Sequence, residues 1–345
     1  MDTVERDSDR AEIDVTAPAR RPRRRLRKAL IITGSVLGAI VLSLGALAAW
    51  FLYAAAPAEP ELDADVVRSS IEVDGMAREY VAVVPADLPA DAPVVFAFHG
   101  SRMDAEGMRA ASGYRFDELA AERGFVAVYP EGYEQTWHDC RATTPYPARE
   151  DDVDDVAFVE AMVADLTDAY GTSTERVFAT GLSNGGHMSL RLATEAPDVV
   201  HGVAAFAAAY PADESNVCEW EGEAVPTMLV LGTADPINPF DGGDAGTFGG
   251  SLGTVLSADD SAAFLADRAG DATTAEVAAY ANADAAGETD VTRTVYGGDA
   301  PVVLFAVEGG GHVVPNPTYA QPRVMGATTS HLDGPLAAVD FFGID

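Results

Sequence analysis

Residues Gly181-Leu182-Ser183-Asn184-Gly185 form the pattern G-x-S-x-G, which places a serine between two glycines. The pattern follows a strand-like run at 176–180 and precedes a helix-like run at 186–196. A sharp strand-to-helix turn of this kind lifts the serine hydroxyl above a sheet, and the glycines keep side chains out of the bend. A Gly/Ser turn can also match this pattern by chance. The flanking strand and helix favour a nucleophilic serine at position 183.

A nucleophilic serine needs a base, and the base needs an acid that orients it. When the serine sits on such a turn, the order along the chain is serine, acid, histidine. Asp235 follows the strand-like run 226–232, and His312 follows the strand-like run 302–307. Open parallel sheets place functional groups at the carboxyl ends of their strands, where both of these residues fall. The sequence therefore predicts Ser183, Asp235 and His312 as catalytic residues.

Other histidines and acids fit this order less well. The remaining histidines lie upstream of the predicted acid or at the start of the final helix-like run: His99, His138, His187, His201 and His331. Five alternative acids after Ser183 follow no clear strand: Asp213, Glu214, Glu219, Glu221 and Glu223. Two more, Asp241 and Asp244, belong to a loop where carboxylates are expected to be solvated.

Acyl transfer also requires backbone donors where negative charge develops on the tetrahedral intermediate. One donor is expected to be the N–H of Asn184, and the other should come from the loop after an earlier strand. The run 94–98 is that strand, and His99-Gly100-Ser101 is its loop. We therefore predict the N–H groups of Ser101 and Asn184 as the oxyanion hole, with His99 bracing the loop.

Aromatic residues follow the next strand-like run, at 125–129. Tyr133 and Trp137 are predicted, together with His99, to contact the substrate. A structural role at the sheet edge stays open for Tyr133 and Trp137.

Strand-like and helix-like runs alternate through most of the chain. Strands are expected near 71–73, 79–84, 94–98, 125–129, 176–180, 202–208, 226–232 and 302–307, and helices near 104–122, 153–169, 185–196, 258–268 and 332–342. This alternation predicts an α/β fold with a mostly parallel central sheet and helices on both faces. Residues 241–253 and 270–290 carry little core-forming pattern and are predicted to form mobile loops or a partial lid.

The N-terminal part carries an uncharged apolar run of 25 residues at 29–53, directly after a basic cluster at 20–28. About 20 apolar residues suffice to cross a bilayer as a helix, and the basic side stays cytoplasmic. A transmembrane signal-anchor is favoured over a cleaved signal peptide, whose apolar core is usually about 7–15 residues. Both alternatives put the catalytic part outside the cytoplasm, anchored to the membrane or secreted. The predicted organisation is a disordered cytoplasmic tail (1–28), this segment, a linker (54–66) and a catalytic domain (67–345).

The net charge is −33, and the acidic excess lies after residue 56, because the first 56 residues hold nine basic and six acidic groups. Such a surface repels nucleic acid and excludes it as a partner. Cys140 and Cys218 are the two cysteines, and they either bridge or stay as isolated thiols. No metal-ligand spacing is present. We predict no metal and no organic cofactor, and a monomer that acts on an ester.

Six motifs occur in an order that resembles a known family. They are His99-Gly100-Ser101, Trp137 near Asp139, Asp154 to Phe158, Thr180 to Gly186, Gly232 to Pro236 and Glu308 to His312. Over residues 68–345 they resemble the secreted polyhydroxybutyrate depolymerase/feruloyl esterase family of α/β-hydrolases. The resemblance implies a carboxylester hydrolase with Ser183 as nucleophile, His312 as base and Asp235 as acid. The chain departs from the family pattern at Leu231-Gly232, where His-Gly is usual. It also departs at Val313-Val314-Pro315, where an aromatic residue followed by proline is common.

Two other functions stay open at this point. The same fold also serves acyltransferases and peptidases, here acting on components of the cell envelope, and it serves non-catalytic binding modules.

Overall fold

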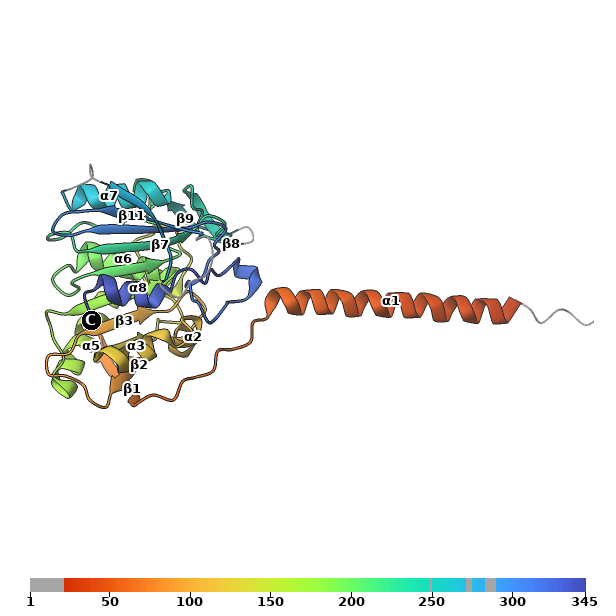
Figure 1. Ribbon diagram of the computed structural model, residues 1–345, viewed down its shortest axis with the longest axis horizontal. Coiled ribbons are helices and arrows are strands. Elements are labelled where there is room, and N and C mark those ends of the chain that lie inside the picture. The colour runs from red at the N-terminus through yellow and green to blue at the C-terminus, as the bar shows by residue number, and fades with distance from the viewer. Residues whose placement is uncertain (1–21, 248–249, 271–274, 283–289) are drawn as a thin grey trace, which may run out of the picture. The chain divides into compact units, whose positions relative to one another are not determined.

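The computed structural model describes residues 22–247, 250–270, 275–282 and 290–345. It divides into two compact units, one ending at Phe51 and one beginning at Leu52. Helix α1 (Pro22–Leu52) accounts for the described part of the first unit (Figure 1). Its segment Leu26–Leu52 is long and apolar enough to cross a membrane, as a signal-anchor or signal sequence would be.

The second unit is built on a sheet of ten strands within the described residues. Their order across the sheet is β1-β2-β4-β3-β5-β6-β7-β12-β11-β10, and the central strands from β4 to β12 run parallel (Figure 1). The strands are β1 (Ala64–Val73), β2 (Met76–Pro85), β3 (Val94–Phe98), β4 (Val126–Pro130), β5 (Val177–Leu182), β6 (Val203–Phe206), β7 (Thr227–Gly232), β10 (Ala275–Tyr280), β11 (Val291–Tyr296) and β12 (Val302–Val307). The flanking strands pair antiparallel, as β1 with β2 and as β10 with β11.

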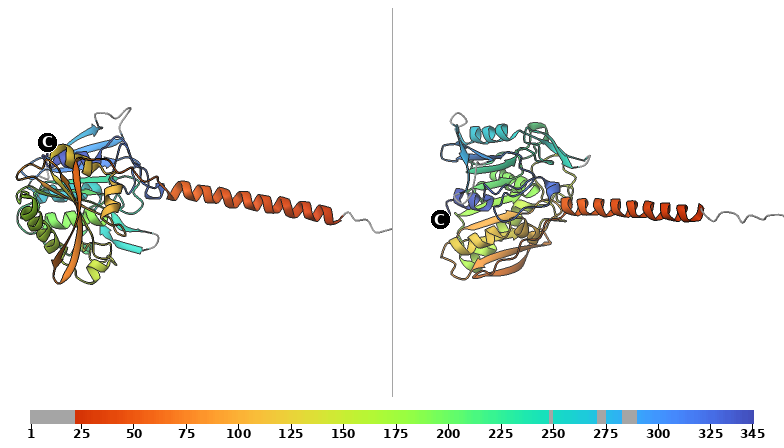
Figure 2. Two further views of the ribbon diagram at one scale, coloured as in Figure 1. Left: turned by 90° about the horizontal axis from the view of Figure 1, so that it is seen from below. Right: turned by 45° about the vertical axis from the view of Figure 1, so that its right-hand side comes forward.

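Helices pack on both faces of this sheet (Figure 2). Apolar residues of α2 (Ala105–Ala111), α3 (Arg115–Arg123) and α8 (Gly334–Phe341) share one core cluster, and those of α5 (Asp155–Tyr170) and α6 (Asn184–Glu195) share another. Successive side chains of a strand point to opposite faces of the sheet, and in β3 they therefore alternate between the two clusters. Val95 and Ala97 belong to the first cluster, whereas Phe96 and Phe98 belong to the second. Both faces are covered, so β3 reads as a continuous apolar run.

The remaining elements cover the ends of the sheet. Helix α7 (Ala258–Arg268) packs its apolar side chains with those of β7 and β12. Short elements complete the unit: α4 (Pro147–Glu150), η1 (Asp213–Ser215), η2 (Arg323–Met325), and the hairpin strands β8 (Gly243–Thr247) and β9 (Gly250–Val255).

The mostly parallel sheet with helices on both faces confirms the predicted fold class. The helix expected at 104–122 is divided in two, because Gly113 and Tyr114 adopt positive φ angles of 66° and 59° between α2 and α3. The prediction of loops was wrong for two stretches: 241–253 contains β8 and most of β9, and 270–290 contains β10. Residues 248–249, 271–274 and 283–289 of these stretches lie outside the described residues.

Candidate active site

Ser183 lies at the turn between β5 and α6. Its backbone angles are φ 58° and ψ −117°, so a residue with a side chain occupies the left-handed half of the backbone map. Backbone strain of this kind is kept only where the surroundings over-determine it, and it clusters at functional sites. Here the Ser183 N–H donates to the Phe206 carbonyl (2.9 Å), and the Ser183 carbonyl accepts from the His187 N–H (2.9 Å).

The glycine at position 185 is required by the closeness of β3. A Cβ atom on Gly185 would lie 2.2 Å from the Phe98 carbonyl oxygen and 2.6 Å from that of His99. The start of α6 therefore packs directly against the backbone that leads into the predicted oxyanion loop. This contact brings Ser183 and residues 99–101 together although they are far apart in the sequence.

His312 and Asp235 form a buried pair at the carboxyl ends of β12 and β7. The His312 Nδ1 atom lies 2.8 Å from Asp235 Oδ2 and 3.0 Å from Oδ1, and the two side chains are 3% and 1% exposed. Asp235 Oδ1 also accepts the backbone N–H groups of Ile237 (2.7 Å) and Asn238 (2.8 Å), which fix the carboxylate. Because a carboxylate accepts at Nδ1–H, the pair leaves Nε2 of a neutral His312 unprotonated. The pair therefore has the form of an oriented base.

A further histidine, His187, lies close to Ser183 along the chain. It follows Ser183 by one turn of α6 and is buried. Burial lowers the pKa of His187 well below its ordinary value, and the nearby charges of Arg141 and His312 act in the same direction. The hydrogen bonds of the described residues do not include one between Ser183 Oγ and His312, and such contacts are often looser before substrate binds.

The predicted oxyanion loop is held by its histidine. The His99 Nε2 atom accepts the Gly132 N–H (2.9 Å), so the ring proton sits on Nδ1, which donates to the Gly100 carbonyl (2.8 Å). Burial lowers the pKa of His99 to about 4, which keeps the ring neutral. A Cβ built on Gly100 would lie 3.6 Å from Ser183 Cβ, so the loop rests against the serine. In the described part of the chain, neither predicted donor, the N–H of Ser101 or of Asn184, is hydrogen-bonded.

The prediction that His99 and Trp137 contact the substrate is not supported by their surroundings. Both side chains are fully buried, and Trp137 Nε1 donates to the His99 carbonyl (2.9 Å). The two rings pack together behind the oxyanion loop. Tyr133 is partly exposed, and its hydroxyl donates to Asp151 Oδ2 (2.9 Å). The indole and imidazole therefore brace the loop, and only Tyr133 presents surface to solvent.

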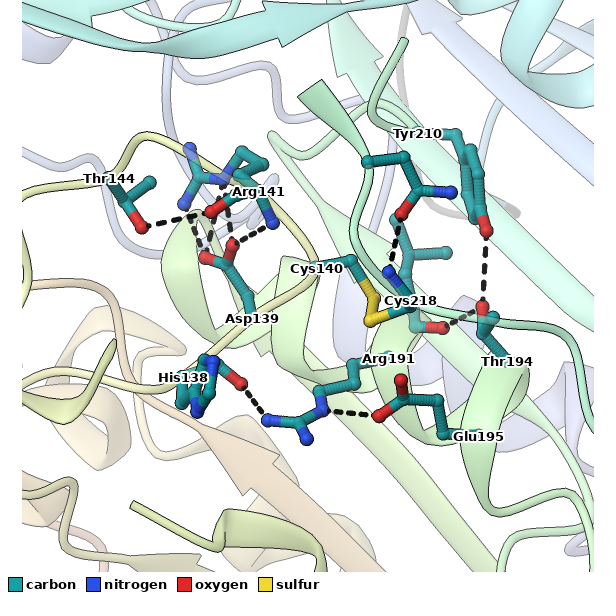
Figure 3. The surroundings of a disulfide bond; sticks show 12 residues. His138, Asp139, Cys140, Arg141, Thr144, Arg191, Thr194, Glu195, Tyr210 and Cys218 are labelled. Atoms are coloured by element: carbon teal, nitrogen blue, oxygen red, sulfur yellow. Dashed lines mark hydrogen bonds and ion pairs between the residues drawn. A yellow bond between two sulfur atoms is a disulfide. The ribbon is translucent and has the colours of Figure 1, made fainter. Parts of the chain in front are cut away.

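A group of buried polar residues beside the site was missed by the sequence analysis. The side chain of Asn184 binds Asp139. Asp139 pairs with Arg141, and the adjacent Cys140 forms a disulfide with Cys218 (Figure 3). The structure thus resolves the alternatives for the two cysteines as a bridge. A weak local signal exists, an Asp and an Arg on either side of a cysteine, but nothing local indicates the partner of Asp139, which lies 45 residues away.

Comparisons with known proteins show the family to which the chain belongs. A model of the family described as "Putative esterase" matches residues 81–285. The chain is 34% identical over 297 residues to "Putative esterase NocK" of Nocardia uniformis subsp. tsuyamanensis, covering 82% of this chain and 84% of that protein. It is 26% identical over 172 residues to "Probable feruloyl esterase C" of Aspergillus niger, covering 48% of this chain and 58% of that protein.

A solved structure supports the fold assignment. The structure of "Acetyl xylan esterase from Aspergillus awamori" has a TM-score of 0.57 at 16% identity, covering 81% of this chain and all of that one. It shares the α/β-hydrolase fold. The resemblance to feruloyl esterases is thereby confirmed, whereas the polyhydroxybutyrate depolymerase part of it stays a prediction. The chain belongs to this esterase family and is a serine carboxylesterase with an α/β-hydrolase fold.

Proposed function

We propose that the protein hydrolyses carboxylic esters outside the cytoplasm through an acyl-enzyme on Ser183. His312 serves as the base, Asp235 orients it, and the N–H groups of Ser101 and Asn184 form the oxyanion hole. The observation that carries the proposal is the buried His312–Asp235 pair, 2.8 Å apart, at the same sheet edge as a serine in a strained turn.

The reaction follows from these groups. Nε2 of His312 takes the proton from Ser183 Oγ as the oxygen attacks the ester carbonyl, and the Asp235 carboxylate stabilises the imidazolium. The two N–H groups donate to the oxyanion of the tetrahedral intermediate. Its collapse breaks the ester bond, and His312 returns the proton to the leaving alcohol. Water then attacks the acyl-enzyme by the same route and releases the acid and free Ser183.

The proposed location rests on three features. The apolar segment Leu26–Leu52 has the length to cross a bilayer. The basic cluster at 20–28 precedes it and favours a cytoplasmic N-terminus. The Cys140–Cys218 disulfide is a bond that persists in oxidising compartments and is rare in the cytosol. An anchored enzyme and a secreted one both agree with these features.

For the substrate we propose an acetyl or hydroxycinnamoyl ester of a carbohydrate. The chain shares sequence with a bifunctional acetylxylan esterase/xylanase of Neocallimastix patriciarum and with feruloyl esterases. A panel of acetylated xylan, methyl ferulate, feruloylated arabinoxylan and hydroxybutyrate oligomers distinguishes this class. Preference for the hydroxybutyrate oligomers would contradict the proposal and favour the depolymerase resemblance.

The catalytic assignment is tested with Ser183→Ala in the full-length protein, solubilised in a mild non-ionic detergent. We expect hydrolysis of nitrophenyl acetate to fall by about 10⁴-fold or more, with an unchanged circular dichroism spectrum. A matched control is Ser189→Ala, a buried serine of the same helix that hydrogen-bonds the Gly185 carbonyl. A fluorophosphonate probe should label the wild type and Ser189→Ala but not Ser183→Ala. Retained activity in Ser183→Ala would exclude this serine.

The location is tested with a membrane-impermeant fluorophosphonate applied to intact cells that produce the full-length protein. Labelling of intact cells or of the medium supports an external domain. Labelling only after lysis would place the domain in the cytoplasm and refute that part of the proposal.

A further inference from the structure

The side chain of Asn184, the residue after the proposed nucleophile, is fully hydrogen-bonded inside the protein. Its Oδ1 accepts the Trp137 N–H (2.8 Å), and its Nδ2 donates to the Trp137 carbonyl (3.0 Å) and to Asp139 Oδ2 (2.7 Å). Both Nδ2 hydrogens are therefore engaged, and the amide cannot rotate without breaking all three bonds. These three hydrogen bonds hold the residue whose backbone N–H is one of the two proposed oxyanion donors.

Asp139 remains an anion in this buried place. Burial would raise the pKa of its carboxyl, but the Arg141 guanidinium beside it holds the pKa below its ordinary value. Arg141 Nη2 donates to Asp139 Oδ2 (2.5 Å), and Arg141 Nε and its backbone N–H donate to Oδ1 (3.1 and 2.9 Å). The carboxylate is 1% exposed and is hydrogen-bonded to neither His312 nor Ser183 among the described residues. Its contact with the proposed machinery is the Asn184 amide.

A covalent bond anchors the segment that carries Asp139. Cys140 bridges to Cys218 across a separation of 78 residues, and Figure 3 shows this bridge beside Asp139 and Arg141. Two backbone bonds accompany it: Val217 N–H donates to the Cys140 carbonyl (2.9 Å), and Ala142 N–H donates to that of Ser215 (2.7 Å). The segment that carries Asp139 is thus attached to residues 215–218, and the attachment lies directly next to Asp139.

The strained backbone at Ser183 explains why the Asn184 side chain needs to be held in place. A positive φ at a non-glycine residue relaxes unless its neighbours prevent it. The peptide between Ser183 and Asn184 carries the donor N–H, and its orientation depends on both residues. Fixing the Asn184 side chain on one side therefore fixes the direction of that N–H, which an oxyanion hole requires before the reaction begins.

We propose that Asp139 is a positioning residue: through the Asn184 amide it orients the Asn184 N–H toward the oxyanion, and the Cys140–Cys218 disulfide holds Asp139 in place. The inference rests on the proposed function, because it assumes an acyl-enzyme at Ser183. It adds a carboxylate and a disulfide that take no part in the proton transfers.

The test is Asp139→Asn in the full-length protein in detergent. The amide keeps the shape of the carboxylate but can place an NH₂ group toward the Nδ2 of Asn184, and it loses the charge that pairs with Arg141. We expect kcat for nitrophenyl acetate to fall by about 10- to 100-fold, with KM changed by less than about threefold, as for a weakened oxyanion donor. The inhibition constant of a phenylboronic acid, which mimics the tetrahedral intermediate, should rise by a similar factor.

Asp117→Asn is the matched control. Asp117 is also a fully buried carboxylate and pairs with Arg109 (2.7 Å), but among the described residues it is hydrogen-bonded neither to Asn184 nor to the segment 137–141. Both variants should lose stability, whereas only Asp139→Asn should change kcat and the boronate inhibition constant. Equal effects of the two variants on kcat and on that constant would overturn the proposal.

The disulfide supplies a second measurement if Asp139→Asn does not fold. The Cys140→Ser/Cys218→Ser double variant should lower kcat by about three- to tenfold and weaken boronate binding in parallel, at temperatures where its circular dichroism matches the wild type. Unchanged kcat and boronate binding would overturn the role of the bridge. Failure of the proposed function is distinguishable, because then the fluorophosphonate would not label Ser183 in the wild type.

Discussion

Replacing His99 with glutamine is expected to remove a loss of stability that the wild-type protein suffers on mild acidification. Burial lowers the pKa of His99 to about 4 in the folded protein, against an ordinary value of 6.5. Between these values the unfolded chain binds a proton that the folded protein does not, so stability falls as the pH falls through this range. The loss begins near pH 6.5 and is complete near pH 4.

The size of the effect follows from the two pKa values. A difference of 2.5 corresponds to about 3 kcal/mol, and about 2 kcal/mol of it has appeared at pH 5. Glutamine suits the site because its oxygen can accept the Gly132 N–H and its NH₂ group can donate to the Gly100 carbonyl, as the neutral imidazole does. His187 titrates in the same direction but is present in both proteins, so its contribution cancels in the comparison.

The assay is urea unfolding of the full-length wild type and His99→Gln in detergent, at pH 8 and pH 5. The free energy of unfolding should drop between the two pH values by about 2 kcal/mol more in the wild type than in the variant. The quantity to compare is the drop in the free energy of unfolding between pH 8 and pH 5 in each protein. The absolute values are not compared, since the variant can be less stable than the wild type at both pH values. Equal drops in the two proteins would show that His99 is not kept neutral by its burial.

Three further variants probe the site and the core beneath it. Asp235→Asn should lower kcat about 10³- to 10⁴-fold with little change in KM, measured with nitrophenyl acetate, because an amide no longer stabilises the imidazolium. Gly185→Ala should prevent folding to the native state, seen as loss of soluble protein and of fluorophosphonate labelling, because its Cβ would lie 2.2 Å from the Phe98 carbonyl. Arg78→Met should cost about 3–5 kcal/mol in urea unfolding, because it leaves the Asp155 carboxylate buried without its partner.

For each of these three variants, one result would contradict the expected effect. Full activity in Asp235→Asn would remove this acid from the reaction. Gly171→Ala is the control for the glycine, since a Cβ there meets nothing within 4 Å and only its φ of 67° opposes the change. Equal stability losses at Gly185 and Gly171 would refute the close contact with β3. A loss below about 1 kcal/mol in Arg78→Met would contradict the reasoning that Asp155 stays a buried anion that depends on Arg78.

The parts of the site that could be predicted are those with a local signal. The serine turn is encoded by Gly181 and Gly185 together with the strand before them and the helix after them. Asp235 and His312 follow apolar runs that can only be buried strands, and the carboxyl ends of parallel strands meet at one edge. Chain order, together with the loop that carries His312, then favours Ser183, Asp235 and His312. The buried 2.8 Å contact between the two side chains agrees with it.

The features that were missed depend on tertiary contacts without a local pattern. Strand β10 (Ala275–Tyr280) has a sequence rich in alanine, and its pairing with β11 supplies the hydrogen bonds that its composition does not predict. Asp155 begins α5, and its partner Arg78 comes from β2, which no local pattern indicates. Trp137 was predicted to contact the substrate because it follows a strand at the sheet edge that carries the oxyanion loop, and a structural role was left open. Its burial follows from its hydrogen bond to the His99 carbonyl, a partner 38 residues away.

The surroundings of Ser183 explain why so much buried polar structure gathers beside a small catalytic group. The strained turn is flanked by two rigid segments, the loop at 99–101 fixed by the neutral His99 and the segment at 137–141 fixed by the disulfide. Trp137 connects these segments, since its indole binds the first and its backbone binds the Asn184 amide. Both proposed oxyanion donors are therefore attached to one framework, and a change in either segment reaches both. Catalytic effects of mutation should then extend to residues that never touch the substrate, whereas those at the far ends of the sheet should affect stability alone.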